Sequence, residues 1–441
     1  MNIGYIGLGS MGGVLARRLV GKHDLTVWDL NGASAAAFKE LGVTVAPTAA
    51  ELARQCDIIL LCLPRTSDVQ KLVFGPGGLA EGLSAGKLVV DQTSGVPGET
   101  VAIANELATR GIAMIDAPVS GGVVGAAAGT ITIMASGPRE HYDRVLPVLD
   151  TISSNVFRCG ERVGDGQAMK LVNNLLSAGC RLAALEVVAL GRKLGLSLAA
   201  ITDAINKGPA CNRTTKVALQ SLVDGKAAVS NFAMALMLKD INQSIQLGKA
   251  CGVPTTLANI VRGLLQIGVS TLGKDVQFDR VMSLIESMAG TRIVDPADGA
   301  EGAYPTAVVA GEKELHAIQN AVGACNLLLT YEAASIAVAY GLKLSEVDTV
   351  INKSTGWSAA SERVLPLLSP ARQTSEVKLH AMVDDLKLAS QLAIEQGAPM
   401  LIANTAASLY EIGAHRLGAE SSIDAMAQLY ESMAGVSFEG A

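Results

Sequence analysis

The pattern of apolar and polar residues divides the chain into two parts. Up to about residue 160, short apolar runs alternate with amphipathic stretches. The runs cover residues 3–8, 25–28, 58–63, 88–90, 112–115 and 131–134. Strands that alternate with helices form a largely parallel sheet with helices on both faces. We therefore predict an α/β domain over residues 1–163.

Helical periodicity replaces the strand pattern from about residue 166 onward. A first long helix is predicted over residues 171–194, and a second copy of the helical unit follows. Residues 186–207 resemble 332–353, 252–254 resemble 397–399, and Glu-Ser-Met-Ala-Gly occurs at both 286–290 and 431–435. A nearly constant offset indicates duplication of a whole unit. We predict two repeated all-helical domains, 164–295 and 311–441, joined by a linker at 296–310 that contains Pro and Gly.

Composition excludes several classes of protein. The 441 residues are 49% hydrophobic and only 3% aromatic, with a net charge of −6. Nucleic acid and anionic membranes are not expected as partners, because no basic patch or aromatic stacking surface is evident. Charged residues interrupt the apolar stretch 175–201, so no membrane span is expected. The chain enters a strand-like run at residue 2 without a cleavable leader, which predicts a cytosolic, cytoplasmic protein.

The cysteines and histidines show no metal-binding pattern. The seven cysteines are scattered without a Cys-x-x-Cys pair, and no two histidines have metal-ligand spacing. We expect reduced, mostly buried thiols, with neither a disulfide framework nor a metal site.

A glycine-rich turn follows the first predicted strand. It reads Gly7-Leu8-Gly9-Ser10-Met11-Gly12 and opens an amphipathic helix, which is the G-x-G-x-x-G fingerprint in a strand–turn–helix context. The glycines permit a tight turn, close approach of the backbone to a pyrophosphate, and tight helix packing. The first domain is therefore predicted to be a Rossmann-type dinucleotide-binding domain.

Asp29 indicates which dinucleotide binds. It ends the second predicted strand, where a carboxylate can accept hydrogen bonds from both ribose hydroxyls and repels a 2′-phosphate. No arginine follows it, so we predict NAD in preference to NADP. Leu63-Pro64 and Thr93 end two further strands, and strand carboxyl ends are where an open α/β sheet binds its ligand. Ordinary strand-to-loop turns are the alternative for these two positions.

Two segments carry candidate substrate chemistry. Residues 116–122, Asp-Ala-Pro-Val-Ser-Gly-Gly, surround Ser120 with small residues, so this loop can hold a carboxylate through backbone amides and a hydroxyl. A flexible loop is the alternative. Residues 164–174 place Lys170 and Asn174 on one face if they are helical. An amine beside an amide can move a proton on and off an alcohol oxygen, although such pairs also occur on solvated helix faces.

The sequence contains three motifs in a fixed order: the glycine-rich turn at 7–12, residues 116–122 and residues 164–174. Together they resemble the 3-hydroxyisobutyrate dehydrogenase family of β-hydroxyacid dehydrogenases, which includes tartronate semialdehyde reductases. The resemblance implies hydride transfer between NAD and a small β-hydroxyacid. It implies that Lys170 is the acid/base, that Asn174 orients the substrate, and that Ser120, Gly121 and Gly122 bind its carboxylate. It also implies that Lys239 lies near the nicotinamide, whereas the residues alone favour a surface charge pair of Lys239 and Asp240.

The second helical unit lacks the residues that the resemblance makes catalytic. In its register His316 replaces Lys170, Asn320 matches Asn174, and Asp384 replaces Lys239. No glycine fingerprint precedes this unit, so we expect a single active site, with His316 as a scaffold residue. Members of the family typically dimerise through their helical domains. The second unit is therefore predicted to pack against the first with approximate two-fold symmetry and to replace a dimer partner, and further self-association is left open.

Three alternatives remain at this point. A 6-phosphogluconate dehydrogenase has the same architecture, but that family shows Lys-x-x-His-Asn where this chain has Asn173 before Asn174, and it prefers NADP. An imine reductase generally replaces the lysine that is present here, and an inactive NAD-binding scaffold is expected to have lost it. The sequence leaves open which β-hydroxyacid is used and in which direction. Residues 206–213 and the neighbourhood of Trp357 are candidates for selecting the substrate.

Overall fold

The computed structural model describes residues 1–226, 232–294, 311–369, 372 and 374–441. It divides into two compact units, Met1–Lys170 and Leu171–Ala441. The second unit contains both helical copies. The linker predicted at 296–310 lies outside the described residues.

The first unit is built on a parallel six-stranded sheet with the order β3-β2-β1-β4-β5-β6. Each neighbouring pair in this sheet is parallel. This is the strand order of the doubly wound dinucleotide-binding fold, so the predicted fold class is confirmed. The strands are β1 (Asn2–Ile6), β2 (Asp24–Trp28), β3 (Thr44–Val45), β4 (Ile58–Leu61), β5 (Leu88–Asp91) and β6 (Ala113–Asp116).

Side chains of the central strands alternate between two apolar cores. Ile58 and Leu60 pack on one face of β4, whereas Ile59 and Leu61 pack on the other, and all four are fully buried. This period of two places a buried face on each side of the strand, as a sheet covered on both sides requires. The helices of this unit are α1 (Gly12–Arg17), α2 (Gly32–Lys39), α3 (Ala49–Gln55), α4 (Thr66–Phe74), α5 (Pro97–Ala108), α6 (Gly122–Ala128) and α7 (Arg139–Ile152), with a short 3-10 turn at Leu79–Glu81.

A second, smaller sheet holds three strands, in the order β7 (Val119–Ser120), β8 (Thr132–Ala135) and β9 (Asn155–Arg158). The pairing of β7 with β8 is antiparallel, and that of β8 with β9 is parallel. Only β8 was predicted among the three. A strand of two residues, such as β7 or β3, is too short to show periodicity, and β9 is half-buried without an apolar run.

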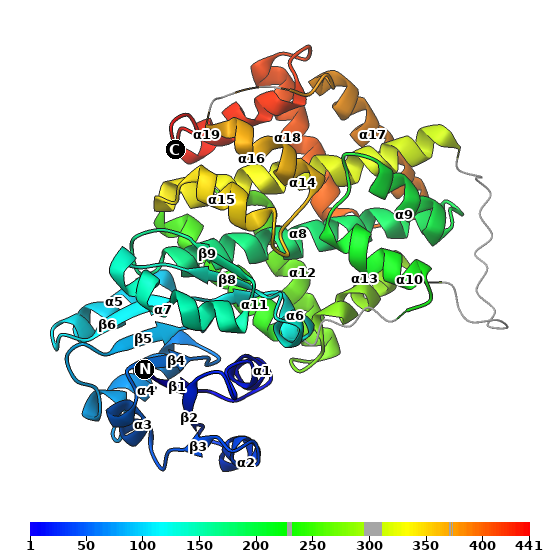
Figure 1. Ribbon diagram of the computed structural model, residues 1–441. Helices are drawn as coiled ribbons and strands as arrows, with labels where there is room; N and C mark the ends of the chain where they lie inside the picture. Colours follow the sequence, from blue (N-terminus) through cyan, green and yellow to red (C-terminus); the bar gives the residue numbers. More distant parts are fainter. Residues whose placement is uncertain (227–231, 295–310, 370–371, 373) are drawn as a thin grey trace. The chain divides into compact units, whose positions relative to one another are not determined.

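Helix α8 (Asp165–Lys193), labelled in Figure 1, contains the boundary between the two units, which falls after Lys170. It and its counterpart α14 (Glu312–Tyr340) are each 29 residues long. By length and composition both pass as membrane-spanning helices, but 89% of each apolar window is buried inside the protein, as in a core helix.

The other helices of the first copy are α9 (Leu198–Lys207), a π-helix at Thr214–Leu219, α10 (Gln220–Val223), α11 (Met234–Ala250), α12 (Thr256–Leu272) and α13 (Val281–Ala289). Those of the second copy are α15 (Leu344–Ile351), α16 (Ala359–Leu368), α17 (Leu379–Gln396), α18 (Leu401–Leu417) and α19 (Met426–Ala434). Short 3-10 turns at Phe278–Arg280 and Ile423–Ala425 occupy equivalent places in the two copies.

The two helical copies contact each other through equivalent residues. Asn212 forms an isolated antiparallel bridge with Ser358, which is its own counterpart at the repeat offset. Across this bridge the Arg213 N–H donates to the Trp357 carbonyl at 3.1 Å, and the Ala359 N–H donates to the Cys211 carbonyl at 2.8 Å. These two bonds exchange when the copies are exchanged, which places the bridge on an approximate two-fold axis.

Each copy also caps a helix of the other. Glu186 in α8 accepts hydrogen bonds from the backbone N–H groups of Leu401 and Ile402 at the start of α18, at 3.1 and 3.0 Å. Its counterpart Glu332 in α14 does the same for the start of α12, with bonds of 2.9 and 2.8 Å. A helix start has N–H groups without intrahelical partners, so each carboxyl completes a helix of the opposite copy. Both glutamates are buried.

Candidate active site

Each of the three glycines of the fingerprint is required for a different structural reason. Gly7 has φ +90°, and a Cβ there would lie 2.2 Å from the Cys62 carbonyl oxygen. A Cβ at Gly12 would lie 1.9 Å from the Gly7 carbonyl oxygen. Gly9 has no heavy atom within 4 Å of its Cβ position. The first and third glycines therefore allow close packing, and the second leaves open space of the kind that a pyrophosphate needs.

Asp29 is held by the turn that it follows. One carboxylate oxygen accepts a hydrogen bond from the Leu8 N–H at 2.5 Å, and the other accepts from the Asn31 N–H at 2.6 Å. Each oxygen has two lone pairs, so a ribose hydroxyl can still donate to either one. The carboxylate is half-buried beside the fingerprint. The residues at this edge of the sheet thus fit the adenosine end of a dinucleotide.

The loops after β4 and β5 meet at the same edge of the sheet. The Leu63 N–H donates to the Thr93 hydroxyl at 3.0 Å, and the Thr93 N–H donates to the Asp91 carboxylate at 3.0 Å. Thr93 is almost fully buried, and Pro64 follows Leu63 directly. The structure therefore brings together the strand ends that were predicted to contact the cofactor.

Ser120 lies in strand β7 and is 4% exposed, so residues 119–120 are not a flexible loop. Gly121 has φ +133° and Gly122 has φ +71°, and α6 begins at Gly122. Positive φ values of this kind are readily adopted only by glycine. The Ser120 hydroxyl thus stands beside two glycines in special backbone conformations, next to the start of a helix.

The first turn of α8 is capped by side chains from the sheet region. Asp116, at the end of β6, accepts from the Gly164 N–H at 2.8 Å and from the Gln167 N–H at 2.7 Å. Ser136 accepts from the Gly166 N–H at 2.8 Å and donates to Asp116 at 2.6 Å. Complete burial raises the pKa of Asp116 to about 7. The helix that carries Lys170 thus begins at a position fixed by strand β6.

Gln167 ties the same turn to the loop after β5. Its Nε2 donates to the Thr93 carbonyl at 2.8 Å, and its Oε1 accepts from the Gly95 N–H at 2.7 Å. Because Thr93 is a predicted cofactor-contacting residue, one side chain links the cofactor edge to the helix that bears Lys170.

Lys170 and Asn174 lie one turn apart on α8 and are 6% and 3% exposed. Residues at this spacing share a helix face. The solvated-face alternative is therefore wrong for both side chains. Asn174 donates from Nδ2 to the Asp240 carboxylate at 2.6 Å, and Lys239 Nζ lies 3.2 Å from the other oxygen of Asp240. Since the Asp240 side chain is 2% exposed, the alternative of a surface charge pair with Lys239 is also wrong.

The equivalent positions of the second copy form a weaker constellation. Asn320 donates to Asp385 at 2.6 Å, which repeats the bond between Asn174 and Asp240. His316 replaces the lysine, and its Nε2 lies 3.0 Å from Asn320 Nδ2. The His316 side chain is 63% exposed. The duplication thus preserved the asparagine and the aspartate without a buried amine.

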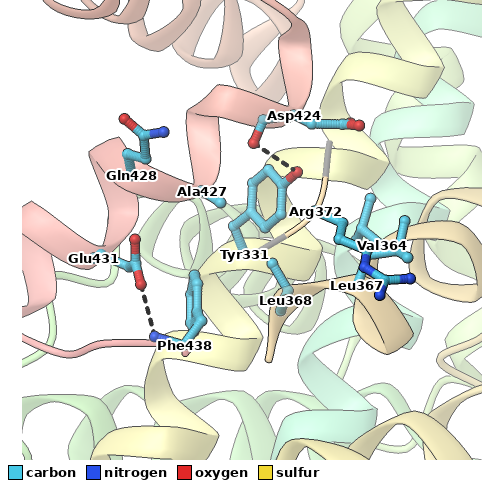
Figure 2. Close-up of a pocket in the computed structure, with 10 residues that line it drawn as sticks. All are labelled: Tyr331, Val364, Leu367, Leu368, Arg372, Asp424, Ala427, Gln428, Glu431 and Phe438. Atoms are coloured by element: carbon cyan, nitrogen blue, oxygen red, sulfur yellow. Dashed lines mark hydrogen bonds between the residues drawn. The ribbon is translucent and has the colours of Figure 1, made fainter. Parts of the chain in front are cut away.

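A cavity of about 50 Å³ lies elsewhere in the second copy (Figure 2). The Tyr331 hydroxyl points to the Asp424 backbone carbonyl at 3.4 Å, and Glu431 accepts from the Phe438 N–H at 2.7 Å. The Asp424 carboxylate already accepts from Arg363 at 2.7 Å. None of the ten residues that line the cavity is among the predicted cofactor-binding, substrate-binding or catalytic residues.

Within the described parts of the chain, no group of three or more His, Cys, Asp or Glu side chains is arranged to hold a metal ion. The seven cysteines are free thiols.

Several residues at the start of α8 and around Asn174 were not predicted. Gln167 and Asn173 lie on α8 itself, Asp240 accepts a hydrogen bond from Asn174, and Thr355 and Gly356 form hydrogen bonds with Asn173. Asp240 had a signal in the sequence, because an aspartate recurs at the same register as Asp385. Thr355 and Gly356 had no such signal, because they reach Asn173 across 182 and 183 positions. Residues 206–213 and the neighbourhood of Trp357, which were separate candidates, are joined by the bridge on the two-fold axis.

Comparison with known families covers both parts of the chain. The family described as the NAD binding domain of 6-phosphogluconate dehydrogenase matches residues 2–160. The family described as NAD-binding of NADP-dependent 3-hydroxyisobutyrate dehydrogenase matches twice, over 164–285 and 313–430. The second match places the same helical family on both copies.

Individual relatives agree with this assignment. The chain is 33% identical over 297 residues to 2-(hydroxymethyl)glutarate dehydrogenase of Eubacterium barkeri, covering 66% of this chain and 97% of the relative. The solved 3-hydroxyisobutyrate dehydrogenase of Mycobacterium tuberculosis with L-serine is 28% identical, with a TM-score of 0.59 over 64% of this chain and 98% of that chain.

A 6-phosphogluconate dehydrogenase of Plasmodium falciparum has the same fold, with a TM-score of 0.68. It covers 93% of this chain and 92% of its own but is only 14% identical, so this likeness concerns the fold alone. The motifs, their placement and the matched families lead to one assignment: the chain belongs to the 3-hydroxyisobutyrate dehydrogenase family of β-hydroxyacid dehydrogenases, with a second copy of the helical domain.

Proposed function

We propose that the protein transfers a hydride between NAD and a small β-hydroxyacid of the 3-hydroxyisobutyrate or tartronate semialdehyde type, with Lys170 as general acid/base. The observation that carries the proposal is the burial of Lys170 and Asn174 together on α8, whose start is fixed by Asp116. An amine and an amide on one helix face can together hold an alcohol oxygen and exchange its proton, as hydride transfer requires.

The chain's own residues have distinct roles in this mechanism. Ser120, with the backbone at Gly121 and Gly122, binds the substrate carboxylate, and Asn174 orients the hydroxyl. Lys170 takes the hydroxyl proton during oxidation and returns it during reduction. Bound NAD supplies the hydride acceptor.

The cofactor residues have positional roles. The glycine-rich turn approaches the pyrophosphate and consists of Gly7, Leu8, Gly9, Ser10, Met11 and Gly12. Asp29 accepts hydrogen bonds from the ribose hydroxyls. Leu63, Pro64 and Thr93 line the cofactor at the strand ends, and Lys239 lies toward the nicotinamide. The carboxylate of Asp29 favours NAD over NADP, since a 2′-phosphate would be repelled.

We also propose that the second helical copy replaces a dimer partner. The exchanged bonds around Asn212 and Ser358, together with the reciprocal caps of Glu186 and Glu332, are those expected of an isologous interface built within one chain. The prediction of a cytoplasmic protein fits a metabolic enzyme of this type. On this proposal the protein is active as a monomer. Light scattering, combined with activity measured across a dilution series, tests this.

The test of activity is a spectrophotometric screen with NAD and with NADP. The substrates are 3-hydroxyisobutyrate, glycerate, 2-(hydroxymethyl)glutarate and 6-phosphogluconate. Lys170→Ala is expected to lower turnover by about 10³-fold or more while NAD binding is retained. His316→Ala, at the equivalent position of the second copy, serves as the matched control and keeps full activity.

Three results would contradict the proposal. Retention of most activity in Lys170→Ala removes the assigned acid/base. Preference for 6-phosphogluconate with NADP favours the sugar-phosphate enzyme. Tight NAD binding without turnover of any hydroxyacid indicates an inactive scaffold.

A further inference from the structure

A line of hydrogen bonds connects the second helical copy to Asn174. The Gly356 N–H donates to Asn173 Oδ1 at 2.9 Å, and Asn173 Nδ2 donates to the Thr355 hydroxyl at 2.9 Å. Asn173 Nδ2 also donates to Asn174 Oδ1 at 3.2 Å. Asn174 then donates to Asp240, as described above. We propose that Thr355 and Gly356 are positioning residues for the reaction, because they fix the Asn174 amide through Asn173; this inference rests on the proposed function.

The two ends of the line determine which way both amides face. At one end the Gly356 N–H can only donate, so the oxygen of the Asn173 amide must face it. At the other end the Asp240 carboxylate accepts, so the nitrogen of the Asn174 amide must face it. Between them, the Asn173 nitrogen then faces the Asn174 oxygen. Neither amide can rotate by 180° without placing two donors or two acceptors together.

Close packing enforces the same position. Gly356 is buried, and a Cβ there would lie 3.0 Å from both the backbone oxygen and the side-chain oxygen of Asn173. It would also lie 3.1 Å from Leu176 Cβ. The segment of the second copy therefore rests directly on the α8 turn that carries Asn174. Asn173 is fully buried, so water does not compete for its bonds.

The duplication provides an internal comparison. Exchange of the two copies converts Thr355 into Pro209, Gly356 into Ala210 and Asn173 into Gln319. Proline has no hydroxyl to match that of Thr355, whereas Ala210 keeps a backbone N–H like that of Gly356. The supporting segment thus has its hydroxyl only on the side of the molecule that retains the buried lysine.

The orientation matters because Asn174 presents what the two bonds leave. Its Nδ2 has a second N–H, and its Oδ1 has a second lone pair, for the hydroxyl and carboxylate of a substrate. A misplacement of about 1 Å in a group that orients a substrate can lower the rate about 100-fold. We therefore expect Thr355 and Gly356 to affect the chemical step without contacting the cofactor.

Two substitutions with matched controls test the proposal. Thr355→Val removes the hydroxyl and keeps the shape, and Thr349→Val does the same on an exposed helical turn of the same copy. Gly356→Ala adds the methyl group against Asn173. Gly413→Ala adds one against Met426, where a Cβ would lie 2.2 Å from the sulfur, far along the chain from the site.

We expect Thr355→Val to lower kcat/KM for the hydroxyacid about 10-fold and Gly356→Ala about 100-fold, with NAD affinity unchanged. Gly413→Ala is expected to lower the Tm without lowering kcat/KM, and Thr349→Val to change neither. Adding Thr355→Val to Asn173→Ala should produce no further loss, because both changes break the same line.

A second readout does not depend on turnover. In protein labelled with ¹⁵N-asparagine, the Asn174 side-chain signals, identified by their loss in Asn174→Ser, should shift in Thr355→Val and Gly356→Ala and stay in place in the two controls. Unmoved Asn174 signals, or full additivity with Asn173→Ala, overturn the positioning role. Shifted signals in a protein without hydroxyacid turnover support the positioning and refute the proposed function.

Discussion

Substituting Glu186 by glutamine is expected to change how the stability of the helical unit depends on pH. Glu186 lies in α8 of the first copy and caps α18 of the second. Burial raises its pKa from the ordinary 4.5 to about 8. A raised pKa means that the folded state holds the proton more tightly than the unfolded state. The resulting stability is fully present below pH 4.5 and is lost as the pH rises through about 8.

The size of this loss follows from the same pKa difference. At about 1.4 kcal/mol for each pH unit, the upper limit is about 5 kcal/mol. The backbone N–H groups at the start of α18 lower this pKa, and their effect is already part of the value of about 8, so the limit of about 5 kcal/mol includes the favourable helix start. Glutamine is neutral at every pH and, like protonated glutamate, offers one carbonyl oxygen to one of the two N–H groups. The variant should therefore match the parent within about 1 kcal/mol near pH 5 and gain on it by up to about 5 kcal/mol toward pH 9.

Urea denaturation at pH values from 5 to 9 measures this difference. A Trp28→Phe background leaves Trp357 as the fluorescent reporter in the helical unit. Glu395→Gln, on the exposed side of α17, controls for the loss of a surface charge. Glu332→Gln gives the reciprocal experiment, with its change complete near pH 7, because burial raises the pKa of Glu332 from 4.5 to about 7. Parallel stability curves for Glu186→Gln and its parent across this range would refute the reasoning.

Three further predictions concern the cofactor edge and the start of α8. Gly9→Ala should leave the Tm nearly unchanged and lower NAD affinity at least about 10-fold. Gly12→Ala should destabilise the protein by about 3 kcal/mol, because its methyl group would meet the Gly7 backbone. Calorimetry and NAD titration separate the two effects, and equal Tm losses would contradict the distinction. Asp29→Asn should reduce the preference for NAD over NADP about 10-fold in kcat/KM, and an unchanged ratio would remove Asp29 from cofactor selection. Asp116→Asn should leave one buried N–H of α8 without an acceptor and lower the free energy of unfolding, measured with urea, by about 1–3 kcal/mol. It should lower kcat more than NAD affinity, and loss of NAD binding alone would contradict this.

The central sheet and the long helices were predictable because their signals are local. Strands such as β4 and β5 are buried on both faces and appear as continuous apolar runs. The start of α8 was predicted at residue 171 but lies at Asp165. Its first turn has little apolar periodicity and is completed by side chains from far along the chain. Asp116 accepts from Gly164 across 48 positions, and Ser136 accepts from Gly166 across 30 positions. Caps of this kind leave no pattern near the helix itself.

The candidate site shows the same division. Lys170, Asn174 and the glycine fingerprint were found from short-range spacing. Asp240 contacts Asn174 across 66 positions, and Gly356 contacts Asn173 across 183 positions. The sequence indicated that a second copy exists and where it aligns, but the residues that it places near Asn174 depend on tertiary packing. That packing depends on contacts between the two copies, which leave no local pattern in the sequence.

The bridge between Asn212 and Ser358 bears on how such a protein can evolve. In a homodimer, a residue on the symmetry axis meets its own copy, so each substitution changes both sides at once and must suit itself. Here an asparagine meets a serine, and each is encoded separately. Thr355 in one half can therefore differ from Pro209 at the equivalent position of the other half. Joining the halves in one gene allows the two helical copies to diverge under different selection.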